Sequence, residues 1–87
     1  MTFLLLRHRV ENYGAWKIAY DKHAPSREAA GLVELNLLRT IADPNEVLIL
    51  FQTEDIERAR DFVQSDDLKN AMKHAGVISM PELIELK

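Results

Sequence analysis

Four side chains in the first third of the chain have types and a spacing that could form a reactive site. Trp16, Tyr20, His23 and Arg27 follow one another at intervals of four, three and four residues, which places them on one face of a helix. Histidine can act as a base near neutral pH, and arginine can hold an oxyanion through paired hydrogen bonds. Laid over an apolar sheet, this face predicts a pocket with His23 as a catalytic base and Arg27 as a substrate-binding group.

Two further candidates stand near the ends of predicted strands. His8 follows the apolar run Phe3–Leu6, and Arg39 ends a second apolar segment. In a fold built from one sheet and covering helices, strand ends lie near the mouth of a pocket. We therefore expect His8 to act as a catalytic base and Arg39 to bind substrate, with the rings of Trp16 and Tyr20 lining the same pocket.

A purely structural role is the open alternative for all of these side chains. Trp16 and Tyr20 would then fill the core, and His23 would lie at an exposed turn. The two arginines, Arg27 and Arg39, would form surface ion pairs. The two alternatives differ in whether a cavity remains beside Trp16.

Composition argues against several other kinds of site. The chain of 87 residues has no cysteine, and its three histidines lack the spacing of metal ligands on a helix, so we expect neither a disulfide nor a metal site. A net charge of −3 with interleaved signs argues against nucleic-acid binding. The N-terminal apolar run is too short for a signal peptide, and no segment has the ~20 apolar residues that span a membrane. The expected location is the cytoplasm.

The hydrophobic pattern predicts four strands and two helical regions in a single domain of residues 1–87. Pro25 is expected to break the first helical region, because proline lacks an N–H and disfavours helical geometry at the residue before it. Ser65 or Asp66 is expected to cap a second segment of the other region. The predicted elements are a strand Thr2–Val10, a helix Glu11–Ala30, strands Leu32–Thr40 and Glu46–Thr53, a helix Asp55–Ala75 and a short strand after Pro81.

The order β-α-β-β-α-β predicts a ferredoxin-like α+β fold. Right-handed crossovers favour a four-stranded antiparallel sheet in the order 4-1-3-2, with both helical regions on one face. The first and third strands carry unbroken apolar runs, as central strands do, whereas charged residues dilute the other two. Polar dilution is typical of sheet edges, which agrees with that order.

The central strands are apolar on both faces of the predicted sheet. Val47, Ile49 and Phe51 alternate with Leu48 and Leu50 along the third strand, so the two sets point to opposite faces. The helices can cover only one of these faces. Because an antiparallel sheet with two apolar faces needs a second layer, we predict a homodimer formed through the uncovered face.

A series of short motifs runs along nearly the whole chain. The motif residues are His8, Val10, Trp16, Tyr20, His23, Arg27, Gly31, Leu38-Arg39, Asp43-Pro44-Asn45, Ser65, Leu68, Met72 and Ala75-Gly76-Val77. The series resembles that of small, mostly uncharacterised bacterial proteins of the antibiotic-biosynthesis-monooxygenase-like (ABM-like) group. This group belongs to the dimeric α+β barrel superfamily.

The resemblance implies a dimer whose two sheets close into a barrel, with a pocket between sheet and helices in each subunit. Members of the superfamily include cofactor-free oxygenases, haem-degrading enzymes, isomerases and proteins without a known activity. The haem-degrading branch uses a tryptophan and a histidine on its second helix, and this chain has Phe62 and Met72 near those positions. We therefore expect no haem and no other cofactor.

For this chain the resemblance implies a cofactor-independent monooxygenase or other oxidoreductase that acts on a small aromatic or enolisable molecule. The pocket would lie between the first helix and the sheet. Its catalytic residues would be His8 and His23, and its substrate-binding residues Trp16, Tyr20, Arg27 and Arg39. The alternative is a non-catalytic homodimeric module that binds a small hydrophobic ligand.

Overall fold

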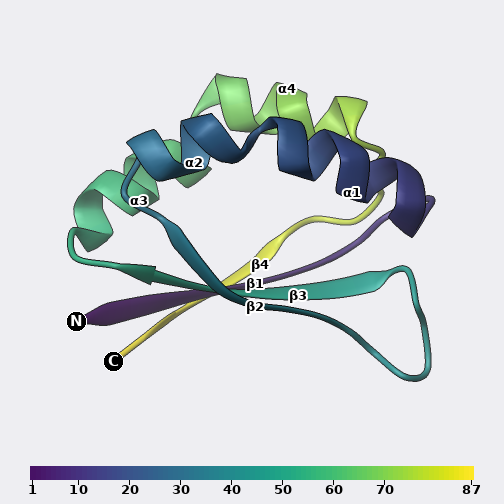
Figure 1. Ribbon diagram of the computed structural model, residues 1–87, viewed down its shortest axis with the longest axis horizontal. Helices are drawn as coiled ribbons and strands as arrows, with labels where there is room; N and C mark the ends of the chain where they lie inside the picture. The colour runs from purple at the N-terminus through teal and green to yellow at the C-terminus, as the bar shows by residue number, and fades with distance from the viewer.

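The chain forms one four-stranded antiparallel sheet with four helices arched over a single face (Figure 1). A computed structural model describes all residues from Met1 to Lys87. The strands are β1 (Thr2–Arg9), β2 (Val33–Arg39), β3 (Glu46–Thr53) and β4 (Glu82–Leu86), and the helices are α1 (Tyr13–Lys22), α2 (Ala24–Ala29), α3 (Ile56–Val63) and α4 (Asp66–His74). The strand order β2-β3-β1-β4 is the predicted order read from the other edge, which confirms the ferredoxin-like α+β fold.

The first helical region is divided as predicted, but the break falls earlier than Pro25. Helix α1 ends at Lys22, and His23 serves as its C-cap before α2 begins at Ala24. Pro25 therefore lies in the first turn of α2, where a missing backbone N–H removes no helical hydrogen bond. Gly31, with a φ of 81°, ends the region by adopting the left-handed conformation that glycine allows.

Helices α1 and α4 each begin at a capping side chain, and the cap of α4 is Ser65, one of the two residues that the sequence indicated. The Asn12 side chain accepts a hydrogen bond from the Ala15 N–H at 3.0 Å, and the Ser65 hydroxyl accepts one from the Leu68 N–H at 3.2 Å. Each bond satisfies a backbone donor that the first turn of a helix leaves without a partner. The break between α3 and α4 is thus specified locally, by Ser65.

Replacing Ser65 with alanine is expected to lower the free energy of unfolding by about 1 kcal/mol, because the N-terminus of α4 loses its side-chain cap. Urea denaturation followed by circular dichroism measures the change. Ser26→Ala in α2 is the matched control, since the Ser26 hydroxyl caps no helix. Equal unfolding curves for wild type and Ser65→Ala would contradict the capping role.

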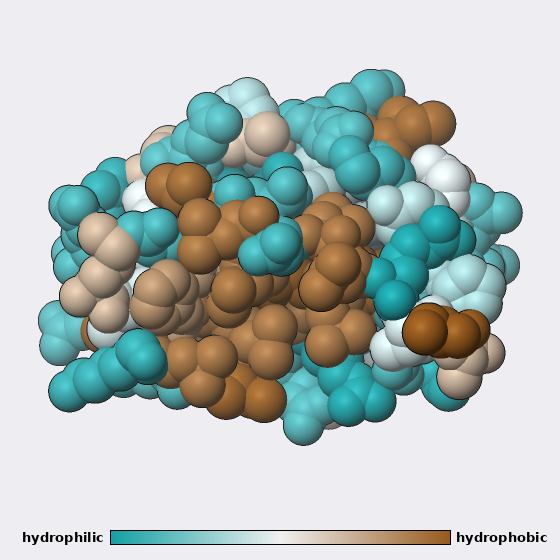
Figure 2. Space-filling view, turned by 60° about the horizontal axis from the view of Figure 1, so that its bottom comes forward, coloured by the Kyte–Doolittle hydropathy of each residue, from teal (hydrophilic) through white to brown (hydrophobic).

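The two faces of the sheet have different surroundings although both are apolar. Leu4, Val47, Ile49 and Phe51 point toward the helices and are buried. The opposite face carries apolar side chains that no helix covers, and Figure 2 shows them gathered into one broad patch. These side chains are Leu5, Leu48 and Leu50, which are half-buried, and Val33, Leu38, Ile84 and Leu86, which are exposed. The prediction of two apolar faces is confirmed.

None of the four helices has the length and apolar character needed to cross a membrane.

Candidate functional site

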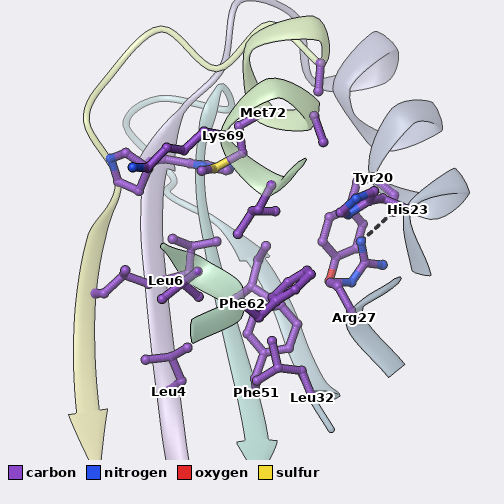
Figure 3. A pocket seen from close by; sticks show the side chains of 18 of the residues that line it. Leu4, Leu6, Tyr20, His23, Arg27, Leu32, Phe51, Phe62, Lys69 and Met72 are labelled. Carbon is purple, nitrogen blue, oxygen red and sulfur yellow. Dashed lines mark hydrogen bonds between the residues drawn. The ribbon is translucent and has the colours of Figure 1, made fainter. Parts of the chain in front are cut away.

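A cavity of about 210 Å³ lies between the sheet and the helices, beside Trp16. It is lined by 21 residues, of which 16 are hydrophobic, so its interior favours an apolar or aromatic ligand. Figure 3 shows Leu4 and Leu6 of β1, Phe51 of β3, Phe62 of α3 and Met72 of α4 around it. The lining residues with ionisable side chains are His8, Tyr20, His23, Arg27 and Lys69.

One wall of the cavity is a continuous stack that begins in β1 and ends in α2. The His8 ring meets the Trp16 ring edge to face, with centroids 5.5 Å apart and planes at 88°. Trp16 stacks on Tyr20 at 4.8 Å, and the Arg27 guanidinium lies 3.6 Å above the centre of the Tyr20 ring. The spacing of four residues in α1 produces the Trp16–Tyr20 contact. The structure thus brings four of the six predicted site residues into one surface.

His8 is buried inside the cavity wall instead of lying at a pocket mouth. His8 is only 3 % exposed, and neither nitrogen of its ring has a hydrogen-bond partner. Burial disfavours the charged imidazolium and lowers the pKa of His8 to about 4. At pH 7 the imidazole is therefore neutral, with one nitrogen able to accept a proton and the other able to donate one.

His23 lines the solvent side of the cavity and joins the two pairs of helices. Its Nε2 atom lies 3.3 Å from the Asp67 carboxylate at the start of α4, and its ring stacks on Phe62 of α3 at 6.0 Å. The side chain retains 20 % exposure. These contacts link the junction of α1 and α2 to both helices on the other side of the cavity.

Tyr20 and Arg27 are held in place by hydrogen bonds outside the stack. The Tyr20 hydroxyl donates to the Glu34 carboxylate of β2 at 2.6 Å. Arg27 Nη1 donates to the Tyr20 carbonyl at 2.7 Å (Figure 3). Burial, followed by this bond to Glu34, raises the pKa of Tyr20. Tyr20 is consequently a neutral hydrogen-bond donor at pH 7, with its proton directed to Glu34 and away from the cavity.

Arg39 does not belong to the cavity, and the expectation that it would share the pocket is wrong. Its Nε donates to the Pro44 carbonyl at 2.7 Å, and its guanidinium lies 3.8 Å above the ring of Tyr13. The end of β2 directs this side chain toward the turn that leads into β3. Arg39 therefore supports the β2–β3 connection.

One ionisable group at the cavity, Lys69, was not predicted from the sequence. Lys69 lies in α4 between Leu68 and Met72, and all three residues line the cavity. Figure 3 shows Lys69 and Met72 on the side of the cavity opposite Arg27. No group of three or more histidine or carboxylate side chains is arranged to hold a metal ion.

No protein-family model and no curated protein matches the chain. Solved structures match it over nearly its whole length, among them three bacterial proteins each described as a "putative antibiotic biosynthesis monooxygenase". The protein from Bordetella bronchiseptica is 17 % identical with a TM-score of 0.80, and the match covers 99 % of this chain and 94 % of that one. The protein from Nitrosomonas europaea is 12 % identical with a TM-score of 0.69 and coverages of 100 % and 97 %. For the protein from Caulobacter crescentus the values are 13 %, 0.72, 98 % and 86 %.

The TM-scores establish a common fold. Identities this low do not establish a common activity. The fold is shared from the first strand to the last, so the likeness includes the sheet and the helices above it. The chain therefore has the ABM-like α+β fold that its motifs indicated.

Proposed function

We propose that this protein is a cofactor-independent, monooxygenase-like enzyme that acts on a small aromatic or enolisable molecule in the cavity beneath α1. The observation that carries the proposal is the burial of the His8 ring without a hydrogen-bond partner. A buried imidazole with two unpartnered nitrogens costs stability, and here it faces an apolar cavity. A ligand that exchanges a proton or a hydrogen bond with His8 would supply the missing partner.

The chemistry that suits this site is oxidation of an activated CH₂ group by molecular oxygen. His8 takes one proton from the carbon, and the resulting carbanion combines with O₂ to form a hydroperoxide that receives the proton. Loss of the second C–H proton breaks the O–O bond, so one oxygen atom stays on carbon as a carbonyl and the other leaves as water. The apolar lining excludes bulk water from the carbanion, and the neutral state of His8 at pH 7 keeps the base ready.

The second candidate function is a non-catalytic module that binds a small hydrophobic ligand. Its support is the same pKa of about 4, which makes His8 a weak proton acceptor in the empty cavity. In that case the cavity and the aromatic stack serve binding alone. In either case we expect the protein to work in the cytoplasm as a homodimer whose uncovered sheet faces pack together, leaving both cavities on the outer sides.

Oxygen uptake separates the two candidates. With 2-indanone, whose CH₂ groups lie between a ring and a carbonyl, we expect the wild type to consume one O₂ for each diketone formed. His8→Phe should lose this uptake while still binding the ketone. The kcat/KM of the wild type should fall only below about pH 4, because protonation of His8 removes the base. Binding without O₂ uptake, by the wild type as well as the variant, would favour the non-catalytic module.

A further inference from the structure

Arg27 presents a positive charge to the cavity without a negative partner. Its side chain is half-buried and lines the cavity. Of the five N–H groups that a guanidinium carries, the structure uses Nη1 for the Tyr20 carbonyl. No carboxylate oxygen lies within 4.0 Å of Arg27, in contrast to Arg7, Arg9 and Arg60.

The carboxylates around Arg27 are already engaged or too distant. Glu34 lies near enough to favour the charged form of Arg27, but its carboxylate already accepts a hydrogen bond from the Tyr20 hydroxyl, with 2.6 Å between the two oxygens. Asp21 forms its ion pair with Lys17 at 2.6 Å, and Glu28 does not reach Arg27. Burial outweighs the attraction of these groups and lowers the pKa of Arg27. A buried charge of this kind is stabilised when an anion arrives to share its N–H groups.

The position of Arg27 also orients a ligand. Arg27 and His8 occupy opposite ends of the stack that runs through Trp16 and Tyr20. A planar ring lying against this wall would place one end beside the guanidinium and the other beside the imidazole. The volume of about 210 Å³ is below the ~300 Å³ at which pockets for drug-sized ligands begin, so the ring system is small.

We infer that the cavity selects an aromatic carboxylate of one or two rings, whose carboxylate pairs with Arg27 while its far edge meets His8. The inference rests on the proposed function, since it names the substrate class of the same cavity. A guanidinium matches a carboxylate with two parallel hydrogen bonds, which gives the ligand a fixed direction. Lys69 is the competing cation, because it lines the cavity on the opposite side and has no carboxylate partner within 4.0 Å.

The test compares two ligands of equal shape that differ in charge, 2-naphthoate and 2-naphthamide, by isothermal titration calorimetry. We expect the wild type to bind 2-naphthoate at least about tenfold more tightly than 2-naphthamide. Arg27→Gln should abolish this preference by weakening 2-naphthoate alone. Arg27→Lys should leave an intermediate preference, because it keeps the charge and loses the paired geometry.

Arg39→Gln is the matched control. Arg39 also covers a tyrosine ring and donates to a backbone carbonyl, but it lies outside the cavity, so its loss should leave the preference unchanged. Equal binding of the two ligands by the wild type overturns the inference and leaves the proposed function standing, since the cavity then accepts neutral rings equally well. A preference that disappears in Lys69→Gln and survives undiminished in Arg27→Gln overturns it in favour of Lys69. Binding of neither ligand contradicts both the inference and the proposed function.

Discussion

His8→Phe is expected to make the protein more stable in acid than the wild type, by up to roughly 3 kcal/mol near pH 4. In the unfolded chain a histidine binds a proton below its ordinary pKa of 6.5, whereas folded His8 resists protonation down to about pH 4. Unfolding therefore takes up a proton in this window, and the stability of the wild type falls as the pH drops from 6.5 to 4. Above pH 6.5 the full contribution of the neutral imidazole is present.

The measurement is the free energy of unfolding from urea titrations at several pH values between 7.5 and 4. Carboxylates also titrate in acid, so the informative quantity is the difference between the variant and the wild type at each pH. This difference should grow steadily below pH 6.5. His74→Gln is the control, because His74 is exposed and bonds only to the Asn70 carbonyl of its own helix.

The variant should also be at least as stable as the wild type at pH 7. Phenylalanine keeps the edge-to-face contact with Trp16 and removes two buried nitrogens that have no partner, and each such group costs about 1–3 kcal/mol. A stabilising substitution that abolishes O₂ uptake would identify His8 as a residue kept for function at the expense of stability. A pH dependence identical in His8→Phe and the wild type would show that His8 is solvated in solution.

Leu50→Asp is expected to convert the protein from a dimer to a monomer. Leu50 lies on the central strand β3, paired with Leu5 of β1, and both point to the uncovered face. A carboxylate there would be desolvated against an apolar partner sheet, which costs several kcal/mol and outweighs the contribution of one leucine to binding. In the monomer the same carboxylate reaches water, so the fold should persist.

Light scattering coupled to gel filtration measures the mass of each variant. The wild type should have twice the 10.0 kDa mass of one chain, and Leu50→Asp should have the mass of one chain. Ile18→Asp is the matched control, because it charges an apolar residue of α1 that is 62 % exposed and lies away from the sheet. A wild type that remains a monomer at micromolar concentration would mean that the apolar patch has no partner copy.

Most of the fold was predictable from the sequence because its specification is local. Asn12, Ser65 and Gly31 mark helix ends through their own backbone bonds or conformation. The alternation of Val47, Ile49 and Phe51 with the leucines between them specified two sets of side chains on opposite faces, since side chains along a strand alternate between faces. The break was predicted at Pro25 and lies at His23. The prediction was displaced because proline fits the first turn of a helix as well as it terminates one.

The candidate site was predictable only in part. The spacing along α1 determined that Trp16 and Tyr20 share a wall, because helix geometry relates residues three and four apart. Arg27 reaches the same wall from α2. Whether that wall faces a filled core or a cavity depends on the side chains that α3 and α4 bring to it. The sequence left this open, and packing of distant segments decided it.

The sequence by itself determined the strand order, the two apolar faces and the face of α1 that carries Trp16 and Tyr20. Only the tertiary structure decided that Arg27 faces the cavity while Arg39, which also covers a tyrosine ring, lies outside it. It likewise decided that His8 is buried without partners and that Lys69 enters the lining. The physical reason is that helix and strand periodicity act between neighbours in the chain. A shared cavity, a lost hydration shell and a missing counter-ion depend on which segments, far apart in the chain, pack against one another.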